Sequence, residues 1–367
     1  MSSLQTERLK SLDVFRGMTV AFMILVNTPG SWSHLFSPLA HADWHGYTPT
    51  DLVFPFFLVA VGLSMSFSFK KYSTQPAKEF YIKVFKRTIL IFLIGMGMRA
   101  FPFTNVDWEG FRILGVLQRI ALAYFFASII IRNITSIRSL LISSGIILFG
   151  YWALLLLFST GNDPYGLETN AVLRFDLWLL GGSHLWQGKG IPFDPEGFLS
   201  TLPSVASVIA GYLFGKLIQT KKQIDLVAAL FLIGNLLVIS GYAWDLVFPI
   251  NKSLWTSSFV LVTSGLGAVL MAFLIYIIDI KNKDKWIEPF LVFGKNTLFI
   301  YVLSILWVKT YFQFQIGDQN TYSWLYSNVF QHIGSDKFGS FLFALAHVAG
   351  CWIVGYFMDK KKIYIKI

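Results

Sequence analysis

Charged residues are scarce in this 367-residue chain, where Asp, Glu, Lys and Arg make up 14% of the sequence and hydrophobic residues 55%. Soluble domains carry about 25% charged residues, because a water-exposed surface has to be covered by polar groups. The composition therefore argues against a water-soluble domain. Aromatic residues reach 17%, which suits Phe facing lipid and Trp and Tyr at a membrane interface.

Cysteine is almost missing, since Cys351 is the one cysteine of the sequence and stands in an apolar run. Disulfides and thiolate metal clusters are thereby excluded. His41 and His45 have the i, i+4 spacing of a helical metal site, but Gly46 and Pro49 argue against a helix there, so we expect no metal. The sequence also lacks the glycine-rich phosphate loop, the nucleophile elbow, the zinc-protease motif and the dinucleotide-binding glycines.

Long apolar segments are plentiful, and each is near the roughly 20 residues that a helix needs to cross a bilayer. No internal repeat or low-complexity linker divides them, so we expect one all-α transmembrane domain over residues 1–367. The first run lacks a cleavage site and is read as a retained helix. The sequence predicts about ten transmembrane helices, near residues 13–31, 51–69, 84–101, 113–131, 139–158, 198–217, 224–244, 254–278, 287–307 and 339–357.

The basic residues are distributed unevenly between the two predicted sides. The side that holds both chain ends carries 21 of the 30 Lys and Arg residues, and the opposite side carries seven. Cytoplasmic loops are enriched in Lys and Arg, so both ends are predicted to be cytoplasmic. Topology thus accounts for the net charge of +10, and we expect no nucleic-acid partner. The long loops 32–50, 159–197 and 308–338 are predicted to face outward.

Titratable side chains concentrate between the first two predicted helices. A neutral imidazole can accept a proton from an attacking amine, and a carboxylate on its other nitrogen would orient the ring. His41 with Asp43 or Asp51 is therefore a candidate catalytic dyad. Asp51 could instead only cap the second helix, and the loop could be an interfacial segment. The cluster comprises Asn27, His34, His41, Asp43, His45 and Asp51.

Two further polar sets fall inside or beside the predicted helices. Buried polar groups in a membrane are costly and are functional candidates, although helix–helix contacts are the alternative. Near the cytoplasmic side, Asp13, Arg16, Lys295 and Asn296 would suit a phosphate-bearing ligand, whereas Lys86 and Arg87 are better explained by anionic lipid. The outer set comprises Asn27, Asp51, Gln118, Arg119, Glu196, Ser200, Thr201, Asn251 and Trp255.

Six segments in chain order resemble the heparan-alpha-glucosaminide N-acetyltransferase family and its bacterial membrane relatives. They cover most of the chain, from about Leu9 to about Val302, and each stands at a predicted helix entrance or exit. The segments are LKSLDVFRGMTVAFMILVN, HADWHGYTPTDLVFPFFLVAVG, RILGVLQRIALAYF, DPEGFLSTLPS, NKSLWTSSFVL and FGKNTLFIYV.

This resemblance implies a membrane acetyltransferase that takes acetyl from cytosolic acetyl-CoA and delivers it to a glucosamine amine across the bilayer. The family's active-site histidine matches His41, followed by Trp44, and its first-helix asparagine matches Asn27. The lysosomal enzyme has an additional luminal domain for which no counterpart is expected here. His45 replaces an asparagine of that enzyme, so a smaller amino sugar or a cell-wall fragment is expected as acceptor. The expected partners are the lipid bilayer and this acceptor, with a homodimer left open, in a bacterial inner membrane.

The resulting hypothesis gives each candidate a role. His41 would act as general base or as an acetyl-imidazole nucleophile, with Asp43 or Asp51 orienting it and Asn27 or Asn251 stabilising the oxyanion. A transporter of an amino sugar, or an O-acyltransferase acting on a glycan or lipid hydroxyl, are the alternatives. Cofactor-binding candidates are Arg16, Lys295, Asn296 and Arg119; substrate-binding candidates are Trp44, His45, Glu196, Asn251 and Trp255.

Overall fold

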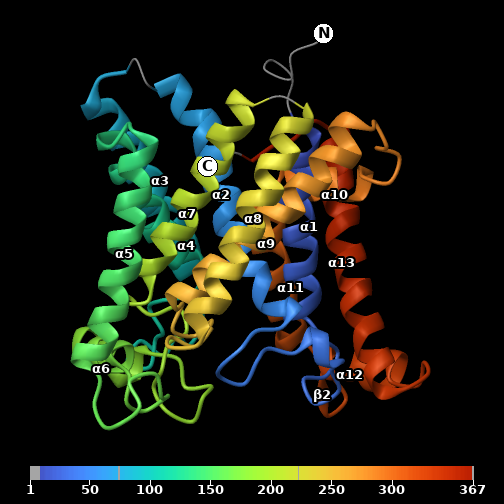
Figure 1. Cartoon of the computed structure of the whole chain (residues 1–367). Coiled ribbons are helices and arrows are strands. Elements are labelled where there is room, and N and C mark those ends of the chain that lie inside the picture. Colours follow the sequence, from blue (N-terminus) through green and yellow to red (C-terminus); the bar gives the residue numbers. More distant parts are fainter. Residues whose placement is uncertain (1–8, 73–74, 222, 366–367) are drawn as a thin grey trace.

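Helices that run between two opposite ends of the molecule make up almost all of the structure (Figure 1). The computed structural model describes residues 9–72, 75–221 and 223–365. The principal helices are α1 (Lys10–Asn27), α2 (Val53–Tyr72), α3 (Ala77–Ala100), α4 (Val116–Asn133), α5 (Ile137–Phe158), α7 (Thr201–Thr220), α8 (Gln223–Asp245), α9 (Ser257–Leu274, continued by π-type turns through Ile280), α10 (Glu288–Lys295), α11 (Thr297–Gln313) and α13 (Asp336–Lys360).

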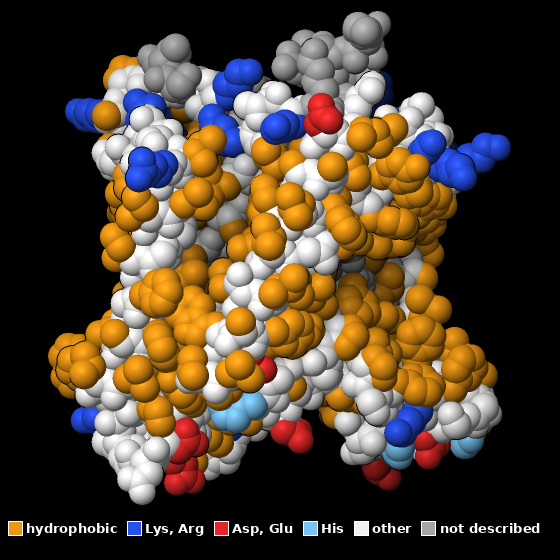
Figure 2. Space-filling view, viewed as in Figure 1, with side chains coloured by type: hydrophobic (Ala, Val, Ile, Leu, Met, Phe, Trp, Pro, Cys, Tyr) orange, Lys and Arg blue, Asp and Glu red, His pale blue; other side chains and the backbone are white. Residues whose placement is uncertain are grey.

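The two ends of the molecule differ in charge. Lys and Arg side chains gather at the end where α1 begins and α13 finishes, which we call the basic end (Figures 1 and 2). Histidines and most visible acidic side chains lie at the opposite end, which we call the loop end, and a broad apolar band separates the two. The loop end also holds α6 (Ala171–Leu180), α12 (Thr321–Leu325) and the hairpin of β1 (Gln315–Ile316) and β2 (Gln319–Asn320).

All ten predicted apolar segments overlap helix in the structure. Within the described residues, seven helices are long and apolar enough to cross a membrane, or eight if α10 and α11 form one span. The helices α1 and α3 carry more charged residues than this set allows. The structure thus confirms a nearly all-helical chain with helices able to span a membrane, while the count of ten and the orientation stay predictions.

One predicted helix is wrong in form. The run 287–307 was expected to be continuous, but α10 and α11 meet at Asn296 with a 90° bend. The Asn296 side chain explains the break, because its Nδ2 donates to the carbonyl of Ile363 at 2.9 Å and its Oδ1 accepts from the amide of Ile365 at 2.9 Å. The C-terminal segment is thereby held against the bend.

Glycines allow the central helices to approach closely. A Cβ on Gly62 of α2 would lie 2.0 Å from the carbonyl oxygen of Val208, and one on Gly211 of α7 would lie 2.1 Å from that of Val59. Small residues permit this backbone contact in membrane helix pairs. The pair α2–α7 is therefore closely packed, and α2 begins directly after the histidine-rich loop.

Candidate active site

His41 is held by a buried carboxylate at the start of α2. Asp51 lies in a short 3-10 turn, Pro49–Leu52, and is 1% exposed. Its Oδ1 is 2.6 Å from Nδ1 of His41, while its Oδ2 accepts from the amides of Ala42 and Thr48, each at 3.0 Å. The two roles considered for Asp51 therefore coincide, because one carboxylate caps the turn and holds the imidazole.

Lys252 joins this pair, and the sequence-based hypothesis had not assigned it a role. Its ammonium is 3.1 Å from Asp51 Oδ1 and 3.1 Å from His41 Nδ1. A neutral imidazole has one N–H and one free lone pair. The shorter contact to Asp51 favours Nδ1 as the donor, which leaves Nε2 with its lone pair for a substrate. The one signal for Lys252 was its place in the NKSLW segment.

A backbone bridge brings the histidine loop against the segment that carries Lys252. The amide of Gly46 donates to the carbonyl of Ile250 at 2.7 Å, and Gly46 has φ +85°, which favours glycine. Beside this bridge, Nδ1 of His45 lies 3.4 Å from Nδ2 of the fully buried Asn251. Partial burial lowers the pKa of His45, although Asp163 and Asp245 oppose the shift. His45 and Asn251 thus belong to the same face as His41.

Asp43, Asn27 and Trp44 were also predicted as site residues, and each bonds to a group other than His41. Asp43 is exposed and its backbone carbonyl accepts from Lys189 at 2.5 Å, while Asn27 Nδ2 donates back to Met23 in α1 at 2.8 Å. The hydrogen bonds found within the described residues join neither Asp43 nor Asn27 to His41, so their catalytic roles stay predictions. Trp44 is anchored by its indole N–H to the carbonyl of Tyr165 at 2.9 Å.

Glu196 lies in an ion-pair cluster beside this site. Arg112 contacts Asp194 at 2.7 Å and Glu196 at 2.6 Å. Burial alone would raise the pKa of Glu196, but Arg112, with Arg119 and Lys252, holds that pKa below its usual range. Glu196 therefore pairs with Arg112 as a carboxylate.

Arg119 and Trp255 form a buried cluster close to the segment that carries Glu196. Arg119 is fully buried, and its Nη2 donates to the Gly197 carbonyl at 3.1 Å and to the Ser200 hydroxyl. Its guanidinium stacks 5.0 Å from the ring centre of Trp255, whose indole N–H donates to Ser207 at 3.3 Å. The two residues, predicted to bind cofactor and substrate respectively, therefore contact each other.

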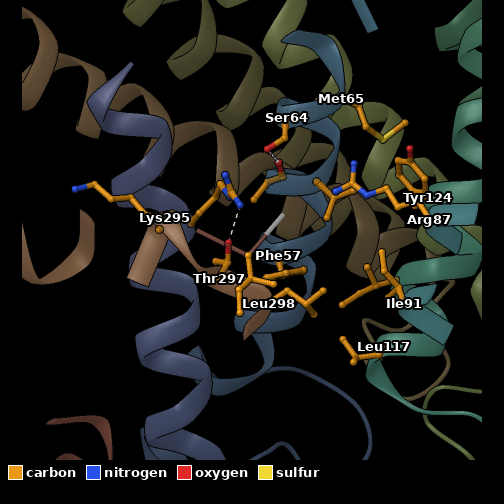
Figure 3. A pocket seen from close by; sticks show the side chains of 16 residues that line it. Phe57, Ser64, Met65, Arg87, Ile91, Leu117, Tyr124, Lys295, Thr297 and Leu298 are labelled. Atoms are coloured by element: carbon orange, nitrogen blue, oxygen red, sulfur yellow. Dashed lines mark hydrogen bonds between the residues drawn. The ribbon is translucent and has the colours of Figure 1, made fainter. Parts of the chain in front are cut away.

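A cavity of about 350 Å³ lies between α1, α2, α3, α4 and the α10–α11 bend (Figure 3). Arg16 and Arg87 line it, and Arg87 also stacks 4.8 Å from the ring centre of Tyr124. Arg16 donates to the Thr297 hydroxyl at 2.6 Å. A neighbouring cavity of about 200 Å³ shares Arg87 and Tyr124 and adds Lys83. Arg87, which the sequence had suggested contacts lipid, therefore faces a cavity.

The residues predicted to bind the cofactor do not all line this cavity. Lys295 contributes to its lining, but its ammonium points away in Figure 3 and pairs with Asp359 at 2.7 Å. The side chain of Asn296 bonds to the C-terminal segment at the helix break. Neither Asn296 nor Arg119 is among the residues that line the cavity. Arg16 and Arg87 are thus the cations best placed to meet a ligand there.

The cavity changes from polar to apolar along α2. Ser64 lies on the same side of the cavity as Arg87, whereas Phe57, Leu117 and Leu298 form an apolar part (Figure 3). Phe57 follows Asp51 by six residues, which corresponds to about 9 Å along a helix. The apolar part of the cavity therefore approaches the level of the His41–Asp51 pair from the basic side.

Comparisons with known proteins identify the family of the chain. Residues 8–252 match the family described as heparan-alpha-glucosaminide N-acetyltransferase, catalytic. The chain is 26% identical to heparan-alpha-glucosaminide N-acetyltransferase of Homo sapiens and to that of Mus musculus, over 98% of this chain and 60% of each relative. It thus spans 60% of the length of these curated relatives. The family match extends from α1 through Lys252, and the chain belongs to the heparan-alpha-glucosaminide N-acetyltransferase catalytic family.

Proposed function

We propose that this protein is a transmembrane acetyltransferase that moves acetyl from acetyl-CoA to the amine of a glucosamine-type sugar. The observation that carries the proposal is the placement of two features along α2. A cation-lined cavity occupies its basic side, and the His41–Asp51–Lys252 group stands just before its first turn. Family membership supports this chemistry over a transport function.

The cavity between α1 and α4 suits the donor. Arginine guanidinium groups bind phosphate through charge-assisted hydrogen bonds, so Arg16 and Arg87 would hold the phosphates of acetyl-CoA, with Lys83 nearby. The apolar part around Phe57 and Leu117 would receive the uncharged arm that carries the thioester. Lys295 would act indirectly, because its ammonium is engaged by Asp359.

His41 would carry the proton transfer. With Nδ1 held by Asp51, Nε2 can take a proton from the attacking amine, or attack the thioester itself to form an acetyl-imidazole. Asn251 offers its Nδ2 as an oxyanion donor on this face, because its Oδ1 already accepts from the Leu254 amide at 2.8 Å. Asn27 and Asp43 remain candidates for supporting roles.

The acceptor would bind at the loop end. Trp44 and His45 stand in the loop and, with Glu196, supply aromatic and carboxylate groups of the kind that bind amino sugars. Trp255 is buried against Arg119 and would act on the acceptor only indirectly. The positive-inside rule assigns the basic end to the cytoplasm, so the acceptor would be met on the outer side of a bacterial inner membrane.

Binding and product analysis with purified protein test this function. A ligand that binds only the folded state raises apparent stability by mass action, so acetyl-CoA should raise Tm. Glucosamine supplied with acetyl-CoA should gain one acetyl group on nitrogen, detected by mass spectrometry. Absence of both a Tm shift and an acetylated product would favour transport, and acetyl on a hydroxyl would favour O-acyl transfer.

A further inference from the structure

A second large cavity lies apart from the donor cavity and shares no lining residue with it. It encloses about 420 Å³ between α1, α2, α9, α10 and α13, and we call it the apolar groove. Among the described residues that line it, Thr19 is the one with a polar side chain, and its hydroxyl donates to the Phe15 carbonyl at 2.7 Å. The groove therefore offers its occupant hydrocarbon contacts and little else.

The apolar groove extends along the helices. Met18 and Leu25 of α1 both line it, and seven helical residues correspond to about 10 Å. Leu345 and Val348 of α13 line the opposite wall, and both lie in the middle of a helix able to span the membrane. This shape suits an extended hydrocarbon chain that lies parallel to the helices.

The loop end of the groove leads to the candidate catalytic group. Pro49 and Leu52 line the groove, and between them stands Asp51, which holds His41. A chain in the groove would therefore end at the turn whose carboxylate holds His41. The donor cavity approaches the same turn from the other side of α2, so the two cavities flank one helix.

A cationic group lies beyond the groove at the loop end. Leu25 also lines a small neighbouring cavity, together with His34, Leu39 and Lys337. His34 is 3.6 Å from Asp336, which leaves Lys337 as the exposed cation of that cavity. A hydrocarbon chain followed by an anionic linkage matches this order of an apolar groove and then a cation.

We propose that the acceptor is a lipid-linked amino sugar, whose hydrocarbon chain lies in the apolar groove and whose anionic linkage meets Lys337. This proposal rests on the proposed function and names its acceptor class. In the reaction the sugar nitrogen bonds to the acetyl carbon, the thioester C–S bond breaks, and the amine proton passes through His41 to the coenzyme A thiolate. A free sugar has no hydrocarbon chain, so it would not occupy the apolar groove.

A series of glucosaminides with methyl, octyl and dodecyl chains tests the proposal. Each buried methylene strengthens binding about fourfold, so kcat/KM should be at least about tenfold higher for octyl than for methyl glucosaminide. Val348→Trp fills the groove and should abolish most of that preference while leaving methyl glucosaminide activity unchanged. Ile353→Trp, on an exposed position of the same helix outside the groove, is the matched control and should keep the preference.

Photolabelling tests, independently of catalysis, whether the hydrocarbon chain binds in the apolar groove. An octyl glucosaminide with a diazirine on its chain should label peptides from α1 or α13, and Val348→Trp should prevent this labelling. If Val348→Trp retains the octyl preference, or if the label falls elsewhere, the groove holds ordinary membrane lipid or another protein and the proposal is overturned. Labelling of the groove without acetyl transfer to any acceptor would instead refute the proposed function.

Discussion

Asp51 contacts His41 through one carboxylate oxygen, at 2.6 Å from Nδ1, and binds the surrounding backbone through the other, at 3.0 Å from the amides of Ala42 and Thr48. The carboxylate is thus shared between the turn that starts α2 and the imidazole of the loop. Since α2 packs closely on α7 through Gly62 and Gly211, the carboxylate that holds the histidine stands at the start of a closely packed helix.

Asp51→Asn should reduce acetyl transfer by about a hundredfold, because general-base catalysis contributes about 10²–10⁴. The asparagine oxygen would be retained by the amides of Ala42 and Thr48, so its NH2 group would face Nδ1 of His41 and favour the wrong tautomer. The rate is measured by release of free coenzyme A thiol. Asp43→Asn is the control, and it should remain within about twofold of the wild type. A large loss in Asp43→Asn with an unaffected Asp51→Asn would reverse the assignment of the orienting carboxylate.

Lys252→Met should lower the rate by about tenfold, since the ammonium contacts both Asp51 and His41 at 3.1 Å. Residues that act as one unit show non-additive losses. The double variant with Asp51→Asn should therefore lose less than the product of the two single effects. Strict multiplication of the effects would show that Lys252 acts separately from the pair.

Arg87→Gln and Arg16→Gln should each weaken acetyl-CoA binding by about tenfold or more, because each removes a charged donor to phosphate. Binding is measured by the acetyl-CoA concentration that gives half of the maximal Tm shift. Lys285→Gln, an exposed cation of the basic end outside the cavity, should bind like the wild type. Equal binding by all three variants would place the donor elsewhere.

The buried carboxyl of Asp176 should make the stability of the folded protein depend on pH. Burial raises the pKa of this carboxyl to about 7, so between about pH 4 and pH 7 the folded state keeps a proton that the unfolded chain releases. Stability therefore falls as pH rises through this window and stays lower above it. The Oδ1 atom accepts from the amides of Phe198 and Leu199, at 3.0 and 3.2 Å, which an asparagine oxygen can also do.

Asp176→Asn should thus raise Tm at pH 8 by about 2–5 °C relative to the wild type and change it little at pH 4. The comparison uses the same detergent and salt at both pH values. A variant that is less stable than the wild type at pH 8 would show that the ionised carboxylate is needed.

The helices were largely predictable from the sequence, because lipid requires long apolar runs and these runs are visible one by one. The break at Asn296 was not predictable in this way. Its side chain bonds to the backbone of Ile363 and Ile365, and hydropathy carries no information on a contact between such distant segments. The charges of α1 and α3 likewise obscure whether those helices are spans.

The sequence indicated which residues were candidates for the site, but it did not indicate which of them contact one another. The clustering of histidines and carboxylates made His41 a candidate and left Asp43 and Asp51 as alternative partners, which a loop of unknown shape cannot separate. The approach of Lys252 depends on the bridge between Gly46 and Ile250, and local sequence does not encode that pairing. Arg87 was assigned to lipid for the same reason, because the cavity forms only when α3 packs beside α4.

Acetyl transfer by the His41→Ala variant tests the central claim most directly. The measurement compares N-acetylated glucosaminide formed by wild type and variant, with the acetyl-CoA Tm shift recorded on both proteins. We predict at least a hundredfold loss of product with an unchanged Tm shift, because the donor cavity does not include His41. Near-normal acetyl transfer by a folded His41→Ala protein would contradict the account.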